Sequence, residues 1–203
     1  MKRNHLYFFL VRFFSPLGRL VFRVRYYGLN NIPKDGKLIV CSNHKSVYDP
    51  FLLAIPFRRQ ICYMAKTELF TDHGYAACAL LYHMGAFPVK RNTGDLKSLR
   101  TAEKILNEGG VVGIFPQGGC VFDNAPFQPK AGVALLAART EAPVLPVAIC
   151  CDGFLKPFKK ISICYGKTIP FSELPVRGTS ALALRKSADI IAERINSMLE
   201  DRS

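Results

Sequence analysis

The feature of this sequence that most constrains its fold is the alternation of short apolar runs with longer segments of helical periodicity. Six runs have the length and the β-branched or apolar character of strands, namely Leu38–Ser42, Gln60–Met64, Ala86–Val89, Val111–Phe115, Val144–Ile149 and Ile161–Tyr165. Alternation of this kind is typical of an α/β domain, in which helices flank a central β-sheet. The 203 residues fit one domain, and no repeat or linker divides them.

Helical patterns fill the segments between these runs. Residues 96–107 are expected to form a helix with Asp95 as its N-cap and Gly109 and Gly110 as its end, and a second helix is expected over residues 130–140. The last helix is predicted over residues 180–201, with one apolar face made of Leu184, Ala188, Ile191, Ile195 and Met198.

The balance of charge and hydrophobicity limits the partners of the chain. It has 28 Lys and Arg against 15 Asp and Glu, a net charge of +13, yet 49% of its residues are hydrophobic. Disorder is excluded, because disordered chains are poor in apolar residues. A basic chain points to a polyanion: nucleic acid, a phosphorylated substrate or a membrane surface. The bases are mixed with aliphatic runs and no nucleic-acid reader motif occurs, so we expect no nucleic-acid partner.

About half of the net charge lies at the N-terminus, where residues 2–34 contain seven Lys and Arg and no acid. On a helical projection at about 100° per residue, His5, Arg12, Arg19 and Arg23 fall within roughly 40°, and most other positions are aromatic or aliphatic. Arg12 and Arg19 interrupt the apolar run, which argues against a membrane-spanning helix and a secretory signal. Pro16 is a position at which the helix is expected to kink or split.

This pattern predicts an amphipathic helical arm over residues 1–25 that lies in a membrane interface. Arg12, Arg19 and Arg23 would meet the phosphates of an anionic membrane surface, and Phe8, Phe9 and Phe13 would enter the acyl boundary. The alternative is an ordinary helix packed on its own domain, with a basic stripe in solvent. The width of the apolar arc favours the membrane, because it exceeds one packing face.

Residues 26–203 are expected to form the domain itself. Its seven cysteines are odd in number, contain no C-x-x-C pair and lie partly in apolar runs, so neither a disulfide framework nor a structural metal is expected. Reduced thiols favour a cytosolic compartment. Together with the arm, they predict a peripheral or monotopic protein on the cytoplasmic side of the cell membrane.

A histidine and a carboxylate follow the first of these predicted strands. Ser42 leads into Asn43-His44-Lys45-Ser46-Val47-Tyr48-Asp49, so that His44 and Asp49 can meet across a strand-to-helix turn. A carboxylate in that place fixes the imidazole tautomer and makes His44 a general base. Taken alone, the pair also fits a buried histidine with only a structural role.

Two further strands end in residues suited to binding anions. Gly85-Ala86-Phe87-Pro88-Val89 delivers Lys90 and Arg91, of which Arg91 can hold a phosphate through two hydrogen bonds; the alternative is a solvated basic turn. The run over residues 111–115 ends in Pro116-Gln117-Gly118-Gly119-Cys120, whose glycine N–H groups can approach a ligand or an oxyanion; the alternative is a simple glycine turn. A fourth run, over residues 143–149, carries little chemistry.

In this order and spacing, the four blocks resemble the glycerolipid acyltransferase family, in particular the 1-acylglycerol-3-phosphate (lysophosphatidate) acyltransferases. His44 and Asp49 match its His-x4-Asp motif, and Val144 to Val147 match its fourth block. The resemblance covers residues 26–170 and implies a single acyltransferase domain of α/β fold. It implies His44 and Asp49 as the catalytic pair, and as substrate-binding residues Lys66, Gly85, Phe87, Lys90, Arg91, Phe115, Pro116, Gln117 and Gly118.

The resemblance also implies the reaction, which is transfer of a fatty acyl group from an acyl thioester to the free hydroxyl of 1-acylglycerol 3-phosphate, giving phosphatidic acid. Acyl-CoA or acyl carrier protein is the co-substrate, and no cofactor or metal is expected. Gln117 departs from the family, which usually has Glu there; an amide accepts hydrogen bonds but supplies no charge. Two alternatives therefore stay open: another acceptor, such as glycerol 3-phosphate or a lyso-aminolipid, and a catalytically degenerate lipid-binding relative.

Overall fold

The structure, a computed structural model, describes residues 4–90, 95–121, 126–151, 153, 158–176 and 180–201. The strands are β1 (Val24–Tyr27), β2 (Leu38–Ser42), β3 (Ile61–Lys66), β4 (Phe87–Val89), β5 (Val111–Ile114), β6 (Val144–Cys150) and β7 (Ile161–Tyr165). The α-helices are α1 (His5–Val21), α2 (Asp49–Ala54), α3 (Glu68–Thr71), α4 (Gly74–His83), α5 (Leu96–Asn107), α6 (Gly132–Thr140) and α7 (Ala181–Glu200), and two 3₁₀ turns are η1 (Leu29–Asn31) and η2 (Phe171–Glu173).

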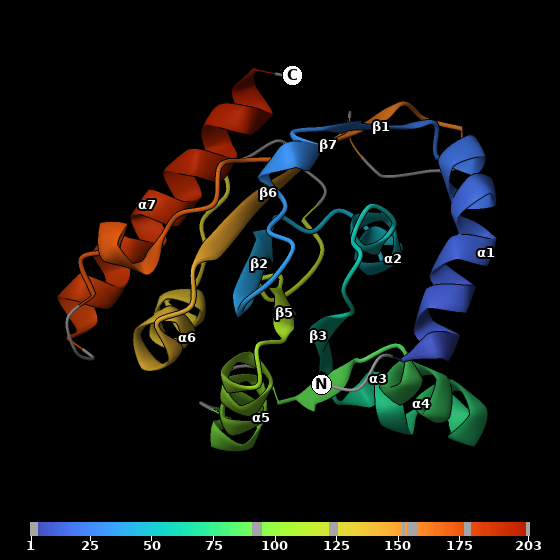
Figure 1. The fold of residues 1–203 in the computed structure, drawn as a ribbon, viewed down its shortest axis with the longest axis horizontal. Helices are drawn as coiled ribbons and strands as arrows, with labels where there is room; N and C mark the ends of the chain where they lie inside the picture. Colours follow the sequence, from blue (N-terminus) through green and yellow to red (C-terminus); the bar gives the residue numbers. More distant parts are fainter. Residues whose placement is uncertain are drawn as a thin grey trace.

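These strands form one sheet in the order β1-β7-β6-β2-β5-β3-β4, flanked by helices on both faces (Figure 1). Strands β6, β2, β5, β3 and β4 pair in parallel, and β7 pairs antiparallel with β6. Every residue of β2 is buried, as expected of a central parallel strand that is covered on both faces. The fold is thus the expected α/β domain, and the carboxyl ends of five parallel strands share one edge of the sheet.

Two apolar clusters fill the space between the sheet and its helices. Alternate residues of β2 enter different clusters: Ile39 and Cys41 face α5, α6 and α7, whereas Leu38 and Val40 face α1 and α2. Figure 1 shows the same division, with α5, α6 and α7 on one side of the sheet and α1 and α2 on the other. The last helix buries the predicted face, since Ala188, Ile191 and Ile195 are in the core and Leu184 and Met198 pack against it.

The predicted elements agree with the structure except at their ends. Strands β2 and β7 and helix α5 have the predicted limits, and Asp95 caps α5 by accepting hydrogen bonds from the N–H groups of Lys97 and Ser98. Helix α1 continues through Pro16 without a break in its assignment. The sequence pattern did not indicate β1, a four-residue edge strand that pairs only with β7 and crosses the predicted boundary between residues 25 and 26.

Helix α1 is attached to the domain along one narrow stripe. Tyr7, Val11 and Gly18 are its buried residues. The Tyr7 hydroxyl accepts a hydrogen bond from the Ile61 N–H at 3.3 Å, and burial raises the pKa of Tyr7 to about 12. At Gly18, an added Cβ would lie 2.8 Å from a ring carbon of Phe51, so glycine is what lets α2 approach this helix.

Candidate functional site

The candidate site lies at the edge of the sheet where the parallel strands end. The chain leaves the sheet at this edge after β2, β3, β4 and β5. In open α/β sheets, ligands bind outside the carboxyl ends of the strands. His44 follows β2 by two residues, and Gln117 follows β5, the neighbouring strand, by three. Lys66 is the last residue of β3, and Lys90 follows β4.

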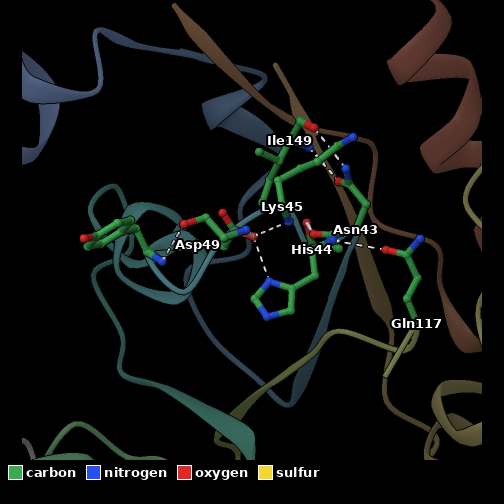
Figure 2. Close-up of polar contacts among 9 residues, drawn as sticks. Asn43, His44, Lys45, Asp49, Gln117 and Ile149 are labelled. Carbon is green, nitrogen blue, oxygen red and sulfur yellow. Dashed lines mark hydrogen bonds and ion pairs between the residues drawn. The ribbon is translucent and has the colours of Figure 1, made fainter. Parts of the chain in front are cut away.

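The structure brings His44 and Asp49 together. The Nδ1 atom of His44 lies 2.7 Å from Oδ2 of Asp49, and the Asp49 side chain is completely buried (Figure 2). A carboxylate accepts hydrogen bonds, so Nδ1 carries the proton and donates it, which leaves Nε2 with a lone pair. Among the described residues, none forms a hydrogen bond with Nε2, and the imidazole remains 12% exposed. This geometry suits a general base.

Two backbone N–H groups hold the carboxylate of Asp49 in place. The N–H groups of Lys45 and Ser46 donate to its Oδ2 atom at 2.6 and 2.8 Å. All three partners of this oxygen are donors, so it acts purely as an acceptor. The Ser46 hydroxyl accepts a hydrogen bond from the Tyr48 N–H and so belongs to the same turn. The backbone between the two residues therefore holds the Asp49 carboxylate beside the His44 ring.

An aromatic stack supports the imidazole from one side. The ring of Phe115 lies against His44, with 4.1 Å between centroids and 19° between planes, and Tyr63 stacks on the far side of Phe115. The Tyr63 ring fills the space above Gly113, where an added Cβ would lie 2.3 Å from it. Burial raises the pKa of Tyr63 well above its usual value, so its phenol is neutral. The stack fixes the plane of the His44 ring.

Gln117 contacts the backbone of His44. Its Oε1 atom accepts a hydrogen bond from the His44 N–H at 3.2 Å (Figure 2). The His44 carbonyl accepts another from the Val121 N–H at 2.7 Å. Both backbone groups of the histidine are thus bound by the segment after β5. This contact needs an acceptor and no charge, so the amide of Gln117 is sufficient for it.

Asn43 is a positioning residue that the sequence argument did not single out. Its amide donates to the Ile149 carbonyl at 2.9 Å and accepts from the Ile149 N–H at 2.8 Å, while its side chain is 3% exposed. The two hydrogen bonds tie the end of β2 to β6 at the point where the chain turns away from the sheet. The sequence shows only an amide residue directly before His44 at the end of a predicted strand, which does not by itself reveal this role.

Lys130 also lies at the site, beside Gly118. Gly118 has a positive φ of 81°, and a Cβ added there would lie 3.2 Å from Lys130 Nζ. The Lys130 N–H donates to the Pro116 carbonyl, so the segment before α6 packs on the glycine turn. The Gly118 N–H donates to the Phe115 carbonyl at 3.2 Å and is committed to the turn. The sequence predicts a helix over residues 130–140 but assigns Lys130 no role in the site.

The other predicted substrate-binding residues lie at different ends of their strands. Lys66 and Lys90 are exposed at the site edge, where Lys66 pairs with Glu68 at 3.2 Å. Gly85 precedes β4, at the opposite end of that strand, where its positive φ and its packing on Gln60 require glycine. Phe87 is buried in the core and is paired with Met64 of β3, although β4 is an edge strand. Arg91 lies outside the described residues.

Five of the predicted membrane-binding residues lie on α1, in two different environments. The helical position predicted for Arg23 is wrong, because α1 ends at Val21 and Arg23 has a positive φ of 42° before β1. Phe9 and Phe13 are 62% and 64% exposed, and they continue into an exposed apolar stripe formed with Leu6, Leu17 and Leu20. Phe8 instead packs against the core. The bases are exposed, and the guanidinium of Arg19 lies 5.3 Å from the centre of the Tyr26 ring.

No helix in the described part of the chain is both long and apolar enough to cross a bilayer. Within the same residues, no group of three or more His, Cys, Asp or Glu side chains is placed to hold a metal ion.

Comparisons with known proteins identify a family and several similar chains. A model of the Acyltransferase family matches residues 23–150, which include β2, the His44–Asp49 turn and the glycine turn. The 1-acyl-sn-glycerol-3-phosphate acyltransferase of Bacillus subtilis is 34% identical over 128 residues, 62% of this chain and 61% of the relative. A chloroplastic protein of the same description from Arabidopsis thaliana is 25% identical over 193 residues, 92% of this chain and 53% of its own length.

A solved structure has the same fold. The crystal structure of the 1-acyl-sn-glycerophosphate (LPA) acyltransferase of Thermotoga maritima matches with a TM-score of 0.72 at 23% identity, covering 100% of this chain and 85% of that one. The chain spans only about half to three fifths of the length of the curated relatives it matches.

Proposed function

Because the chain belongs to the Acyltransferase family, we propose that it transfers a fatty acyl group from an acyl thioester to the free hydroxyl of 1-acylglycerol 3-phosphate. The observation that carries this proposal is the His44–Asp49 contact at 2.7 Å, at the sheet edge where a ligand binds. Two of the similar proteins are 1-acyl-sn-glycerol-3-phosphate acyltransferases, which supports the choice of acceptor.

In this mechanism His44 acts as a general base. Its Nε2 atom takes the proton from the acceptor hydroxyl while the hydroxyl oxygen attacks the thioester carbon. The imidazolium that forms is stabilised by Asp49, which bonds to Nδ1–H. When the tetrahedral intermediate collapses, the C–S bond breaks and the imidazolium returns the proton to the thiolate. Neither a nucleophilic Ser nor a Cys is required, and the Ser46 hydroxyl is already bound within the turn.

The oxyanion and the acceptor phosphate need partners of positive character. We assign the oxyanion to backbone N–H groups that follow Gly118, with the ammonium of Lys130 beside them. The acceptor phosphate is assigned to Lys66 and Lys90, which lie at the same edge, and to Arg91, which follows Lys90 in the sequence. Holding the phosphate there would orient the hydroxyl toward the thioester, which is worth several orders of magnitude in rate.

Helix α1 is the proposed membrane contact. Its buried stripe and its exposed apolar stripe lie on opposite sides of the helix, and Arg12 and Arg19 fall between them on the wheel. A helix of this kind binds an anionic interface with its apolar side chains in the acyl boundary and its bases at the phosphates. Both substrates carry acyl chains, so this contact would bring the site to them, on the cytoplasmic side of the cell membrane.

The test is lipid mass spectrometry after incubation of the pure protein with vesicles that contain one lysolipid at a time. Acceptors are 1-acylglycerol 3-phosphate, glycerol 3-phosphate and a lyso-aminolipid, each offered with acyl-CoA and with acyl carrier protein. Formation of phosphatidic acid from the first acceptor is the expected result. Acylation of another acceptor would correct the substrate, and no transfer with any pair would identify a lipid-binding relative without catalysis.

A further inference from the structure

A basic groove lies on helix α5, outside the site at the strand ends. It has a volume of about 480 Å³ and is lined by Leu96, Lys97, Arg100, Thr101 and Lys104. The three bases are exposed, and among the residues that the structure describes none of them is paired with an acid. Grooves that bind small molecules have volumes of roughly 300–1,000 Å³. This groove therefore has the size and the charge for a small polyanion.

The spacing of the three bases places them in one stripe along the helix. Arg100 and Lys104 follow Lys97 by three and seven residues, so the three lie within about 60° on a helical projection and over about 10 Å along the axis. The opposite face of α5, with Ala102 and Leu106, is buried in the core. A basic face in solvent is ordinary on a helix, so the surroundings of this stripe decide what it means.

The acids nearest to the stripe are bound elsewhere or lie beyond it. Helix α5 itself contains one acid, Glu103, which pairs with Arg139 of α6. Asp95, the N-cap, accepts hydrogen bonds from N–H groups of the first turn, and Glu108, the C-cap, follows the last base. None of these three acids lines the groove. The positive charge of the groove is thus available to an anionic ligand.

The groove begins at the edge of the sheet that carries the site. Helix α5 follows β4, whose carboxyl end lies at that edge, and runs back to the start of β5, so that Lys97 is the base nearest the site and Lys104 the farthest. Helices α5 and α1 cover opposite faces of the sheet (Figure 1). A ligand would therefore reach α5 from the side away from the proposed membrane contact, which favours a soluble polyanion over a lipid head group.

We propose that this groove binds the nucleotide part of coenzyme A, an adenosine that carries a 3′-phosphate and a diphosphate. This inference rests on the proposed function, because the ligand is the acyl donor of that reaction. Three cations in a line suit several phosphate groups, since Lys and Arg bind phosphate through charge-assisted hydrogen bonds. Leu96, which is 61% exposed, offers an apolar contact for the adenine ring.

The consequence is that the two substrates use separate cations. The pantetheine arm of the donor would extend from the groove to the strand ends, where its thioester meets His44. Lys66 and Lys90 at the strand ends remain for the acceptor phosphate. A donor with the same thioester but no nucleotide would then bind through its arm alone and would be indifferent to the charge of α5.

Steady-state kinetics with two donors test the proposal. The wild type and the double variant Lys97→Gln/Arg100→Gln are assayed with acyl-CoA and with acyl-pantetheine, which has the thioester and no nucleotide. We expect kcat/KM for acyl-CoA to fall about tenfold, through a higher KM, because two contacts to phosphate are lost. With acyl-pantetheine, kcat/KM should stay within about twofold of the wild type.

The matched control is Arg185→Gln/Lys186→Gln on α7, which removes the same two residue types from an exposed surface. It should leave kcat/KM for both donors unchanged, and a loss equal to that of the α5 variant would assign the effect to net charge. Equal losses with both donors would assign the α5 bases to the structure of the helix. A loss with acyl carrier protein but none with acyl-CoA would identify an acidic protein as the occupant. Each of these outcomes overturns the proposal.

Calorimetric titration with coenzyme A gives a readout that does not depend on transfer. The dissociation constant should rise about tenfold in the α5 variant and stay unchanged in the α7 control. Equal binding by the wild type and the α5 variant would overturn the groove assignment, while transfer from acyl-pantetheine by the wild type would leave the proposed function standing. Binding of coenzyme A without transfer from any donor would have the opposite meaning, with the groove retained and the activity refuted.

Discussion

The turn between β2 and α2 and helix α1 are neighbours on the domain, yet they are held in opposite ways. In the turn, the backbone N–H and carbonyl of His44, its ring nitrogen and its ring face all have described partners. Helix α1 is fixed along one stripe, whereas its other apolar stripe has side chains that are 45–73% exposed. The imidazole that we propose as the base is thus held from several directions, whereas the helix that we propose as the membrane contact has an exposed apolar stripe.

The largest effect is expected from Asp49→Asn, which disturbs the hydrogen bonds that hold His44. The amide presents a donor to Nδ1 or reverses the tautomer, so we expect kcat to fall by roughly 10³ to 10⁴. Steady-state acyl transfer measures this, and vesicle flotation should be unchanged because α1 is intact. A kcat within tenfold of the wild type would contradict the assigned role of Asp49.

The next largest effect is expected on the exposed stripe of α1, from the double change Phe9→Ser and Phe13→Ser. Removing two largely exposed aromatic side chains should weaken vesicle binding by about 10 to 100-fold, since each buried apolar side chain contributes roughly 1.5–3 kcal/mol at most. Flotation measures the loss, and Leu182→Ser on α7 is the matched control. These point changes are preferable to deleting the helix, because Tyr7 and Val11 belong to the core. Undiminished flotation would refute the membrane role.

A smaller effect is expected from the link between the two strand ends at Gln117. Gln117→Leu leaves the His44 N–H without its acceptor, which costs about 1–3 kcal/mol for a buried group and should lower kcat/KM about tenfold. Gln117→Glu keeps the acceptor and should stay within a few-fold of the wild type. If kcat/KM of Gln117→Leu equalled that of the wild type, the hydrogen bond to the His44 N–H would not contribute to activity.

The smallest effect is expected at the N-cap of α5. Asp95→Ala removes the acceptor for the N–H groups of Lys90, Ser98 and Lys97 and should lower the free energy of unfolding by about 1 kcal/mol, or the Tm by about 2–4 °C. Urea or thermal unfolding measures this, and activity should change little.

The contribution of Asp95 to stability should also depend on pH in a defined direction. The Lys90 N–H first, and then those of Ser98 and Lys97, hold the pKa of Asp95 below its usual 3.8. A carboxyl whose folded pKa is depressed stabilises the protein fully above its unfolded pKa and loses that contribution as pH falls through the folded value. The difference between wild type and Asp95→Ala should therefore shrink below about pH 4, and a constant difference would contradict the assignment.

Much of the fold could be read from the sequence, because central strands are continuous apolar runs and α5 and α7 have one apolar face each. Strand β1 could not, since its four residues pair with only one neighbour and carry no clear alternation. The His44–Asp49 contact followed from a spacing that one turn can close. The roles of Asn43, Gln117 and Lys130 could not be read, because each depends on a partner 70 or more residues away or across a turn.

The central claim is that His44 is the base of an acyl transfer to a lysophospholipid. The most direct measurement is the rate at which phosphatidic acid forms from 1-acylglycerol 3-phosphate and an acyl thioester on anionic vesicles, for the wild type and His44→Ala side by side. The account predicts product with the wild type and a loss of several orders of magnitude with His44→Ala, while both proteins float with the vesicles. Equal rates for the two proteins, or no product from the wild type, would contradict it.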